Sequence, residues 1–80
     1  MPNTKITKEE ACYWDIKSAM DAKQLNQAKI AKRLGLTQGS ISIYMRDIYK
    51  TKGDKILLLS DIIGIDIFEI MTKHWKEEYP

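Results

Sequence analysis

This 80-residue sequence lacks most features on which secreted proteins, metalloproteins and membrane proteins depend. It contains one cysteine and one histidine, so it has no internal disulfide and no cysteine–histidine set for a metal ion. Its longest uninterrupted aliphatic run, residues 56–59, is far too short to span a membrane, and the N-terminus has no apolar signal core. We therefore expect a small protein of the reducing cytoplasm that needs no cofactor.

Catalytic motifs are equally scarce. The four glycines form no phosphate-binding loop, and no nucleophile is accompanied by a suitable base. His74 lies in a charged C-terminal stretch, where a surface position is more common than a catalytic one. The sequence thus predicts a protein that is not an enzyme.

Charge is distributed unevenly, although the net charge is only +2. From residue 23 to residue 55, eight basic residues stand against two acidic ones, whereas from residue 56 onward five acidic residues stand against two basic ones. A basic surface can neutralise DNA phosphates and release their counterions. Taken alone, the asymmetry is equally consistent with ordinary solvated helix faces.

The spacing of apolar residues predicts an all-α fold with five helices in one domain over residues 1–80. The first helix follows a capping box at Thr7 and Glu10 and ends near residue 22. The other four cover about residues 27–34, 38–45, 55–63 and 67–74, with Asp54 as the expected cap of the fourth. Residues 1–6 are expected to form a flexible lead, residues 46–53 a basic loop and residues 75–80 a tail.

The most informative stretch is residues 25–44, which reads as two short helices joined by a tight turn. Asn26 and Thr37 are suited to cap these helices, and Gly35 is suited to end the first one. Ile30 and Ile41 fall on the faces that would be buried. This arrangement is typical of a helix-turn-helix motif, whose second helix enters the DNA major groove.

The sequence resembles the Cro/C1-type helix-turn-helix family, which includes the repressor and Cro proteins of lambdoid phages. The resemblance covers about residues 14–71 and is strongest in Leu-Asn-Gln-Ala, Leu-Gly-Leu-Thr-Gln and Ile-Ile-Gly-Ile-Asp. It implies a five-helix lambda-repressor-like domain that binds specific double-stranded DNA, usually as a symmetric homodimer on a pseudo-palindromic operator. The brevity of the chain favours a compact Cro-like repressor.

The resemblance also implies which residues contact DNA. In the family, the glutamine that opens the second helix bonds a phosphate and braces the first residue of the third, and Gln27 and Gln38 stand at those positions. A glutamine there can pair with adenine, and Ile43 can meet a thymine methyl. The predicted base contacts are Gln38, Gly39, Ser40, Ser42 and Ile43. The predicted phosphate contacts are Gln27, Asn26, Thr37, Arg46, Lys50, Lys52 and Lys55. The alternative is that these polar and basic residues are merely solvated.

One departure from the family concerns a buried ion pair. Many members place an arginine and a glutamate where this sequence has Met20 and Met45. We predict that the two methionines touch, because apolar packing avoids the cost of dehydrating two charges and methionine fills irregular space well.

The C-terminal part offers a surface for association. Phe68, Met71, Trp75 and Tyr79 can form an apolar stripe, and we expect the first three to form a homodimer interface. The alternative is that Phe68 and Met71 complete the core while Trp75 and Tyr79 belong to a half-ordered tail. A protein-interaction module, such as an antitoxin or an anti-repressor that retains the helix-turn-helix fold, is the alternative function.

Overall fold

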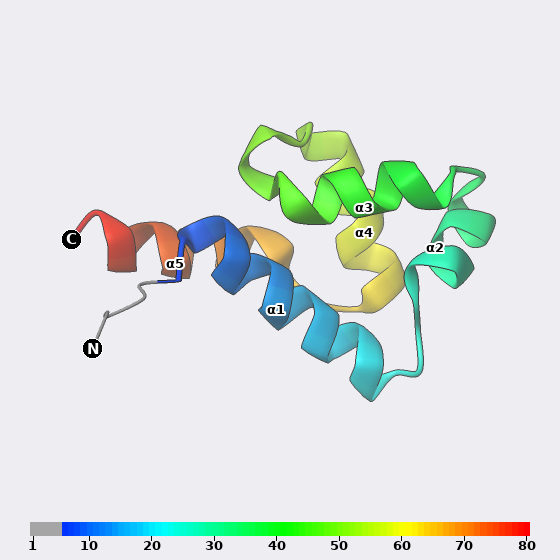
Figure 1. Cartoon of the computed structure of the whole chain (residues 1–80), viewed down its shortest axis with the longest axis horizontal. Coiled ribbons are helices and arrows are strands. Elements are labelled where there is room, and N and C mark those ends of the chain that lie inside the picture. The colour runs from blue at the N-terminus through cyan, green and yellow to red at the C-terminus, as the bar shows by residue number, and fades with distance from the viewer. Residues whose placement is uncertain (1–5) are drawn as a thin grey trace.

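The computed structural model describes residues 6–80. Within this range the chain forms five α-helices and one short 3-10 helix, and no strand occurs among the described residues (Figure 1). The elements are α1 (Lys8–Ala22), α2 (Gln27–Leu34), α3 (Gln38–Arg46), η1 (Ile48–Lys50), α4 (Gly53–Ile63) and α5 (Ile67–Glu78). The prediction of an all-α fold with five helices is confirmed. The expected flexible lead falls outside the described residues except for Ile6.

Side-chain caps fix the beginnings of the first three helices, as the sequence predicts. The Thr7 hydroxyl accepts a hydrogen bond from the Glu10 amide at 3.1 Å, and Asn26 Oδ1 accepts one from the Lys29 amide at 2.8 Å. Thr37 caps α3 in the same way. Each cap satisfies a backbone donor that has no partner within its helix. The predicted capping box is only half formed, because the Glu10 carboxylate accepts from the Thr7 hydroxyl at 3.1 Å and not from the Thr7 amide.

The predicted loop over residues 46–53 and the predicted cap at Asp54 are corrected by the structure. Ile48 is fully buried, which draws this segment against α1 and α3 and folds it into η1. Helix α4 then begins at Gly53, and its N-cap residue Lys52 makes no side-chain cap bond. Asp54 lies inside the first turn, where Oδ1 accepts from the Lys55 amide at 2.9 Å.

Helix α5 continues to Glu78, beyond the predicted end at residue 74. Trp75 and Tyr79 explain the extension, because their ring centroids lie 4.7 Å apart and Trp75 also packs on Tyr49 at 5.8 Å. These contacts stabilise the last helical turns against fraying. Only two described residues follow the helix.

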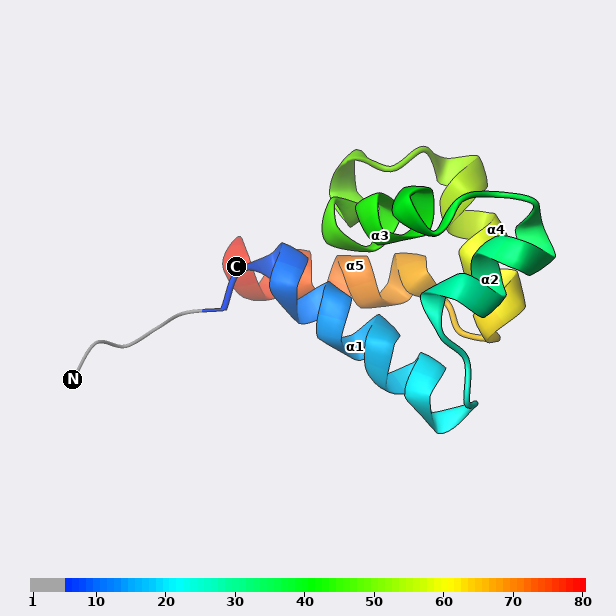
Figure 2. The same cartoon turned by 45° about the vertical axis from the view of Figure 1, so that its right-hand side comes forward.

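Every α-helix contributes to one aliphatic core. Helix α1 packs against α5 and α3, and α2 packs against α3. In both views the start of α1 lies beside the end of α5, and α2 lies at the other end of the molecule (Figure 1, Figure 2). The buried residues are Cys12, Ile16, Met20, Ile30, Ala31, Ile41, Met45, Ile48, Ile56, Leu59, Ile63 and Ile67. This core holds α2 and α3 in a fixed relation.

Candidate nucleic-acid interface

The turn between α2 and α3 is built as the sequence predicts. Gly35 ends α2 with a φ of +68°, a conformation that costs little only for glycine. The next amide, that of Leu36, donates to the Ala31 carbonyl at 2.9 Å and closes the turn. Ile30 and Ile41 are fully buried across it. The two helices are therefore fixed against each other both by the chain and by the core.

The predicted base contacts lie at the first turn of α3 and along the part of its surface that the core does not cover. Gln38 and Gly39 are exposed, Ser40 and Ser42 are half-buried, and Ile43 is 60% exposed. An exposed isoleucine beside a fully buried Ile41 shows how sharply α3 divides into two faces. The accessible surface of α3 therefore carries small and polar side chains and one apolar side chain, that of Ile43.

Two of these positions have further structural detail. The Ser40 hydroxyl lies 2.9 Å from the Thr37 hydroxyl, so it shares in the cap of α3. A Cβ atom added at Gly39 would meet nothing nearer than that Thr37 oxygen at 3.9 Å. The protein's own packing therefore does not require a glycine at position 39, and the space beside the α3 backbone is open.

Gln27 and Gln38 line the same hollow, together with Met20, Asn26 and Met45. Within it, the Gln27 side-chain amide lies 3.7 Å from the Met45 sulfur, which can accept its hydrogen bond. Both methionines are buried, at 3% and 1% exposure, and belong to the core. The hydrophobic replacement of the family's ion pair thus occupies the core, while direct contact between the two sulfur-bearing side chains stays a prediction.

The predicted phosphate contacts lie around α3 and at the beginnings of helices. Asn26 and Thr37 occupy the N-caps of α2 and α3, and Gln27 is the first residue of α2. Beyond α3, Arg46, Lys50 and Lys52 are exposed and Lys55 is half-buried in the first turn of α4. None of the ion pairs found within residues 6–80 involves these four basic side chains. Their charges are therefore available to a polyanion.

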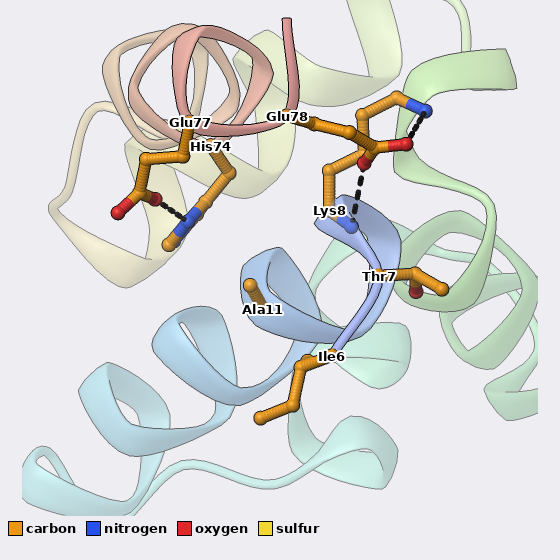
Figure 3. A pocket seen from close by; sticks show the side chains of 7 residues that line it. All are labelled: Ile6, Thr7, Lys8, Ala11, His74, Glu77 and Glu78. Atoms are coloured by element: carbon orange, nitrogen blue, oxygen red, sulfur yellow. Dashed lines mark hydrogen bonds and ion pairs between the residues drawn. The ribbon is translucent and has the colours of Figure 1, made fainter. Parts of the chain in front are cut away.

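An aromatic cage around Lys8 lies at the other end of the molecule and was not foreseen from the sequence. Its ammonium nitrogen is 5.3 Å from the ring centroids of Tyr49, Trp75 and Tyr79. The same nitrogen lies 3.4 Å from Glu9 Oε2 and 3.7 Å from Glu78 Oε1, and Figure 3 shows Glu78 reaching Lys8. We call Lys8 and these three rings the Lys8 cage. No spacing rule predicts it, because its residues come from α1, η1, α5 and the C-cap of α5.

The charge of Lys8 is favoured by this environment. Partial desolvation by itself lowers the pKa of Lys8, but the hydrogen bond to Glu9 and the charges of Glu78 and Glu9 outweigh it and raise the pKa above its ordinary value. Lys8 therefore remains a cation at neutral pH, as an attraction to three aromatic faces requires.

Tyr49 connects the Lys8 cage to the core. Its hydroxyl donates to the Met71 carbonyl at 2.6 Å and lies 3.4 Å from the Cys12 sulfur. Burial, followed by the hydrogen bond with Cys12, raises the pKa of Tyr49. Burial likewise raises the pKa of the Cys12 thiol, although the bond with Tyr49 opposes the change. Both groups are therefore protonated at neutral pH.

His74 is not the plain surface residue that the sequence suggested. Its side chain is 12% exposed, with Nε2 2.6 Å from Asp15 Oδ2 and Nδ1 2.6 Å from Glu77 Oε1 (Figure 3 shows the bond to Glu77). The bond to Asp15 links α5 to α1. His74 thus helps to join the two helices at the end of the molecule that carries the Lys8 cage.

The residues predicted for a homodimer interface do not form one uniform stripe. Phe68 is 40% exposed and lies near Gly53, whose added Cβ would meet its ring at 4.0 Å. Met71 is half-buried against the core, and Trp75 belongs to the Lys8 cage although it is 48% exposed. Leu57, at 60% exposure, lines a shallow hollow with Phe68. The apolar surface therefore continues from α5 onto α4.

Two further findings concern residues 6–80. No helix in this range is both long and apolar enough to cross a membrane. No group of three or more metal-binding side chains gathers within the same range.

The comparisons with known proteins agree with this geometry. A family model described as helix-turn-helix matches residues 16–70, which include all of α2, α3 and α4. No curated protein and no solved structure was found to match the chain. Because the match covers more than half of the sequence, the chain belongs to the Cro/C1-type helix-turn-helix family, a family of DNA-binding proteins.

Proposed function

We propose that this protein is a Cro-like repressor of the cytoplasm that binds a pseudo-palindromic operator in double-stranded DNA with α3 in the major groove. One observation carries the proposal. Helix α3 turns Ile41 and Met45 into the core, leaves Gly39 and Ile43 accessible on the opposite face, and exposes Gln38 at its first turn. A helix divided in this way can be inserted into a groove without disturbing the fold.

Sequence reading is assigned to this accessible face. Gln38 opens α3, so it leads when the N-terminal end of the helix enters the groove, and its amide can pair with the N6 and N7 atoms of adenine. Gly39 leaves room for close approach of the backbone, and Ile43 can contact a thymine methyl. Ser40 and Ser42 can bond base edges or nearby phosphates.

Phosphate contacts are assigned to the surroundings of α3. Backbone amides at the N-termini of α2 and α3, beside Asn26 and Thr37, suit bound anions, and Gln27 adds a side-chain donor. On the other flank, Arg46, Lys50, Lys52 and Lys55 supply positive charge. Such contacts position the protein on the duplex and leave sequence discrimination to α3.

Homodimer formation, at least on DNA, is assigned to the apolar surface of α4 and α5. Leu57 and Phe68 line one hollow and are 60% and 40% exposed, and Met71 and Trp75 extend the surface along α5. Aromatic and large aliphatic side chains are frequent in such interfaces. A symmetric pair would place two copies of α3 about one DNA turn, roughly 34 Å, apart.

Selection of bound duplexes from a random pool tests the proposal. We expect a palindromic consensus, and we expect Gln38→Ala to weaken binding to it by about 10- to 100-fold and to relax selectivity at one base pair. Ser18→Ala, on the exposed surface of α1, serves as a control that leaves binding unchanged. Enrichment of no sequence would contradict the proposal. Absence of binding to any DNA at low salt would indicate the alternative, a protein-interaction module such as an antitoxin or an anti-repressor.

A further inference from the structure

We infer that the Lys8 cage is a positioning device for DNA binding, which holds η1 so that Lys50 meets a phosphate. The inference rests on the proposed function and extends it to residues that do not touch DNA. It begins with Tyr49, the central residue of η1, and ends with Lys50, the residue that follows it.

Tyr49 is fixed from several directions. Its ring packs on Trp75 at 5.8 Å and faces the Lys8 ammonium nitrogen at 5.3 Å, while its hydroxyl donates to the Met71 carbonyl at 2.6 Å. These partners lie on α1 and α5, far from Tyr49 in the sequence. The position of η1 therefore depends on how the two ends of the chain meet.

Lys8 is the one described residue that interacts with all three rings of the cage. The three rings surround one ammonium group, each at a distance where a cation and an aromatic face attract. Glu78 accepts from the Lys8 amide at 3.2 Å and lies near its ammonium group, which ties the last turn of α5 to the first turn of α1. Loss of the Lys8 charge should therefore loosen Trp75 and Tyr79 together with Tyr49.

The other side of η1 is tied to α3. The Thr51 hydroxyl donates to the Tyr44 carbonyl at 3.1 Å and to the Asp47 carbonyl at 2.9 Å. The Lys50 amide also donates to the Asp47 carbonyl, at 2.9 Å. Because η1 is joined to the end of α3 on one side and to the Lys8 cage on the other, the cage can set where Lys50 stands relative to α3.

A direct role for Lys8 in binding DNA fits its surroundings less well. Its side chain is only 12% exposed, and Glu9 and Glu78 already face its charge. Lys50 is exposed and takes part in none of the ion pairs of the described residues. The effect of Lys8 on DNA binding should therefore pass through Lys50.

A double-mutant cycle on the full chain tests this. We expect Lys8→Met to weaken binding to the selected duplex about 3- to 10-fold and to reduce the slope of log affinity against log salt by about one phosphate contact. In the presence of Lys50→Gln, Lys8→Met should have no further effect on either quantity, whereas Lys8→Arg should retain parental binding. Lys17→Met is the matched control, because Lys17 lies on α1 and pairs only with Asp21 among the described residues. Its effect should add to that of Lys50→Gln.

Hydrogen exchange of the free protein supplies a second measurement that needs no DNA. Lys8→Met and Trp75→Leu should speed exchange of the Lys50 and Thr51 amides, which bond to the Asp47 and Ile48 carbonyls, and Lys17→Met should not. Additive effects of Lys8→Met and Lys50→Gln, or unchanged exchange in η1, would overturn the inference alone. If the parent protein binds no duplex, the proposed function fails and the inference fails with it.

Discussion

The helix-turn-helix unit at one end of the molecule and the junction of α1 with α5 at the other are held together by different interactions. In the first, short-range caps at Asn26 and Thr37 combine with buried aliphatic side chains. In the second, Lys8, His74 and three aromatic rings join segments up to 70 residues apart in sequence. The first end is therefore stabilised mainly by burial and local bonds, and the second by charges and aromatic faces.

A substitution in the helix-turn-helix unit should therefore weaken the whole fold, whereas a substitution at the junction of α1 with α5 should act locally. Ile30 and Ile41 belong to the common core, so damage to them weakens the whole fold. The last turns of α5 contain no buried residue beyond Ile67, so damage to the Lys8 cage should open that end while the core persists.

The largest effect should come from the core of the helix-turn-helix unit. Ile41→Ala removes a fully buried side chain and should lower the free energy of unfolding by about 2–5 kcal/mol, because a cavity is left between α2 and α3. Urea unfolding measures the change. The matched control is Ile43→Ala on the same helix, where 60% exposure predicts a change within about 0.5 kcal/mol. Equal losses in the two variants would contradict the assignment of the two faces of α3.

Substitution of the two glycines with a left-handed backbone, Gly35 and Gly64, should lower the free energy of unfolding by different amounts. Only Gly64 lies beside a side chain, that of Lys23, which hydrogen-bonds to the end of α4. Gly35→Ala meets open space, so it should cost only the backbone strain, about 1–2 kcal/mol. Gly64→Ala should cost about 1 kcal/mol more, since its Cβ would displace the Lys23 ammonium group that donates to the Ile63 carbonyl at the end of α4. In a Lys23→Met background, equal costs at both glycines would support this reason. A persistent difference there would refute it.

Loss of the N-cap of α2 should have a smaller effect on the free energy of unfolding. Asn26→Ala removes the acceptor of the Lys29 amide and should lower the free energy of unfolding by about 1 kcal/mol. Asn26→Asp keeps an acceptor at the helix N-terminus and should retain parental stability. Thermal or urea unfolding of the pair measures the effect. A loss of the same size in both variants would show that the cap bond is not the cause.

The smallest expected effect is a loss of stability at high pH, which arises from Cys12 and Tyr49 at the junction of α1 with α5. The pKa of Cys12 and the pKa of Tyr49 are raised mainly by burial, so the folded state binds these protons more tightly than the unfolded state. This stabilisation is complete below the ordinary thiol pKa, about 8.5, and is lost as the pH rises toward the raised value. Urea unfolding at pH 8 and pH 10 should show a decline that is shallower in Cys12→Ala. Identical declines would exclude the thiol as a contributor.

Local sequence predicted most of the fold because the first three helices carry their own start signals. Helix α2 has the predicted bounds, and α3 is longer by one residue. Helix α4 was predicted to start at residue 55 because Asp54 is a good cap, but it starts at Gly53, two residues earlier, after the turn that the burial of Ile48 folds into η1. The end of α5 was missed because Trp75 and Tyr79 are stabilised by Tyr49 and Lys8, which are distant in sequence.

The site was predictable to a similar extent. The 3.6-residue period separates Ile41 from Gly39 and Ile43, so that part of the accessible face of α3 follows from spacing alone. Gln38 lies three residues before Ile41 and is exposed because it is the first residue of the helix. The same period links Cys12 with Ile16 and Met20, and the burial of Cys12 could have been found from it. Nothing in the spacing of residues joins Lys8 to Tyr49, since their contact depends on how α1, η1 and α5 converge.

The all-α class, the capped turn between α2 and α3 and the two faces of α3 follow from local sequence, because caps and helical periodicity act over a few residues. Long-range packing, in contrast, makes residues 48–50 a helix against the core, extends α5 to Glu78 and places Lys8 among three rings. Those outcomes depend on contacts between residues that are distant along the chain. They form only when the core has set the positions of the helices.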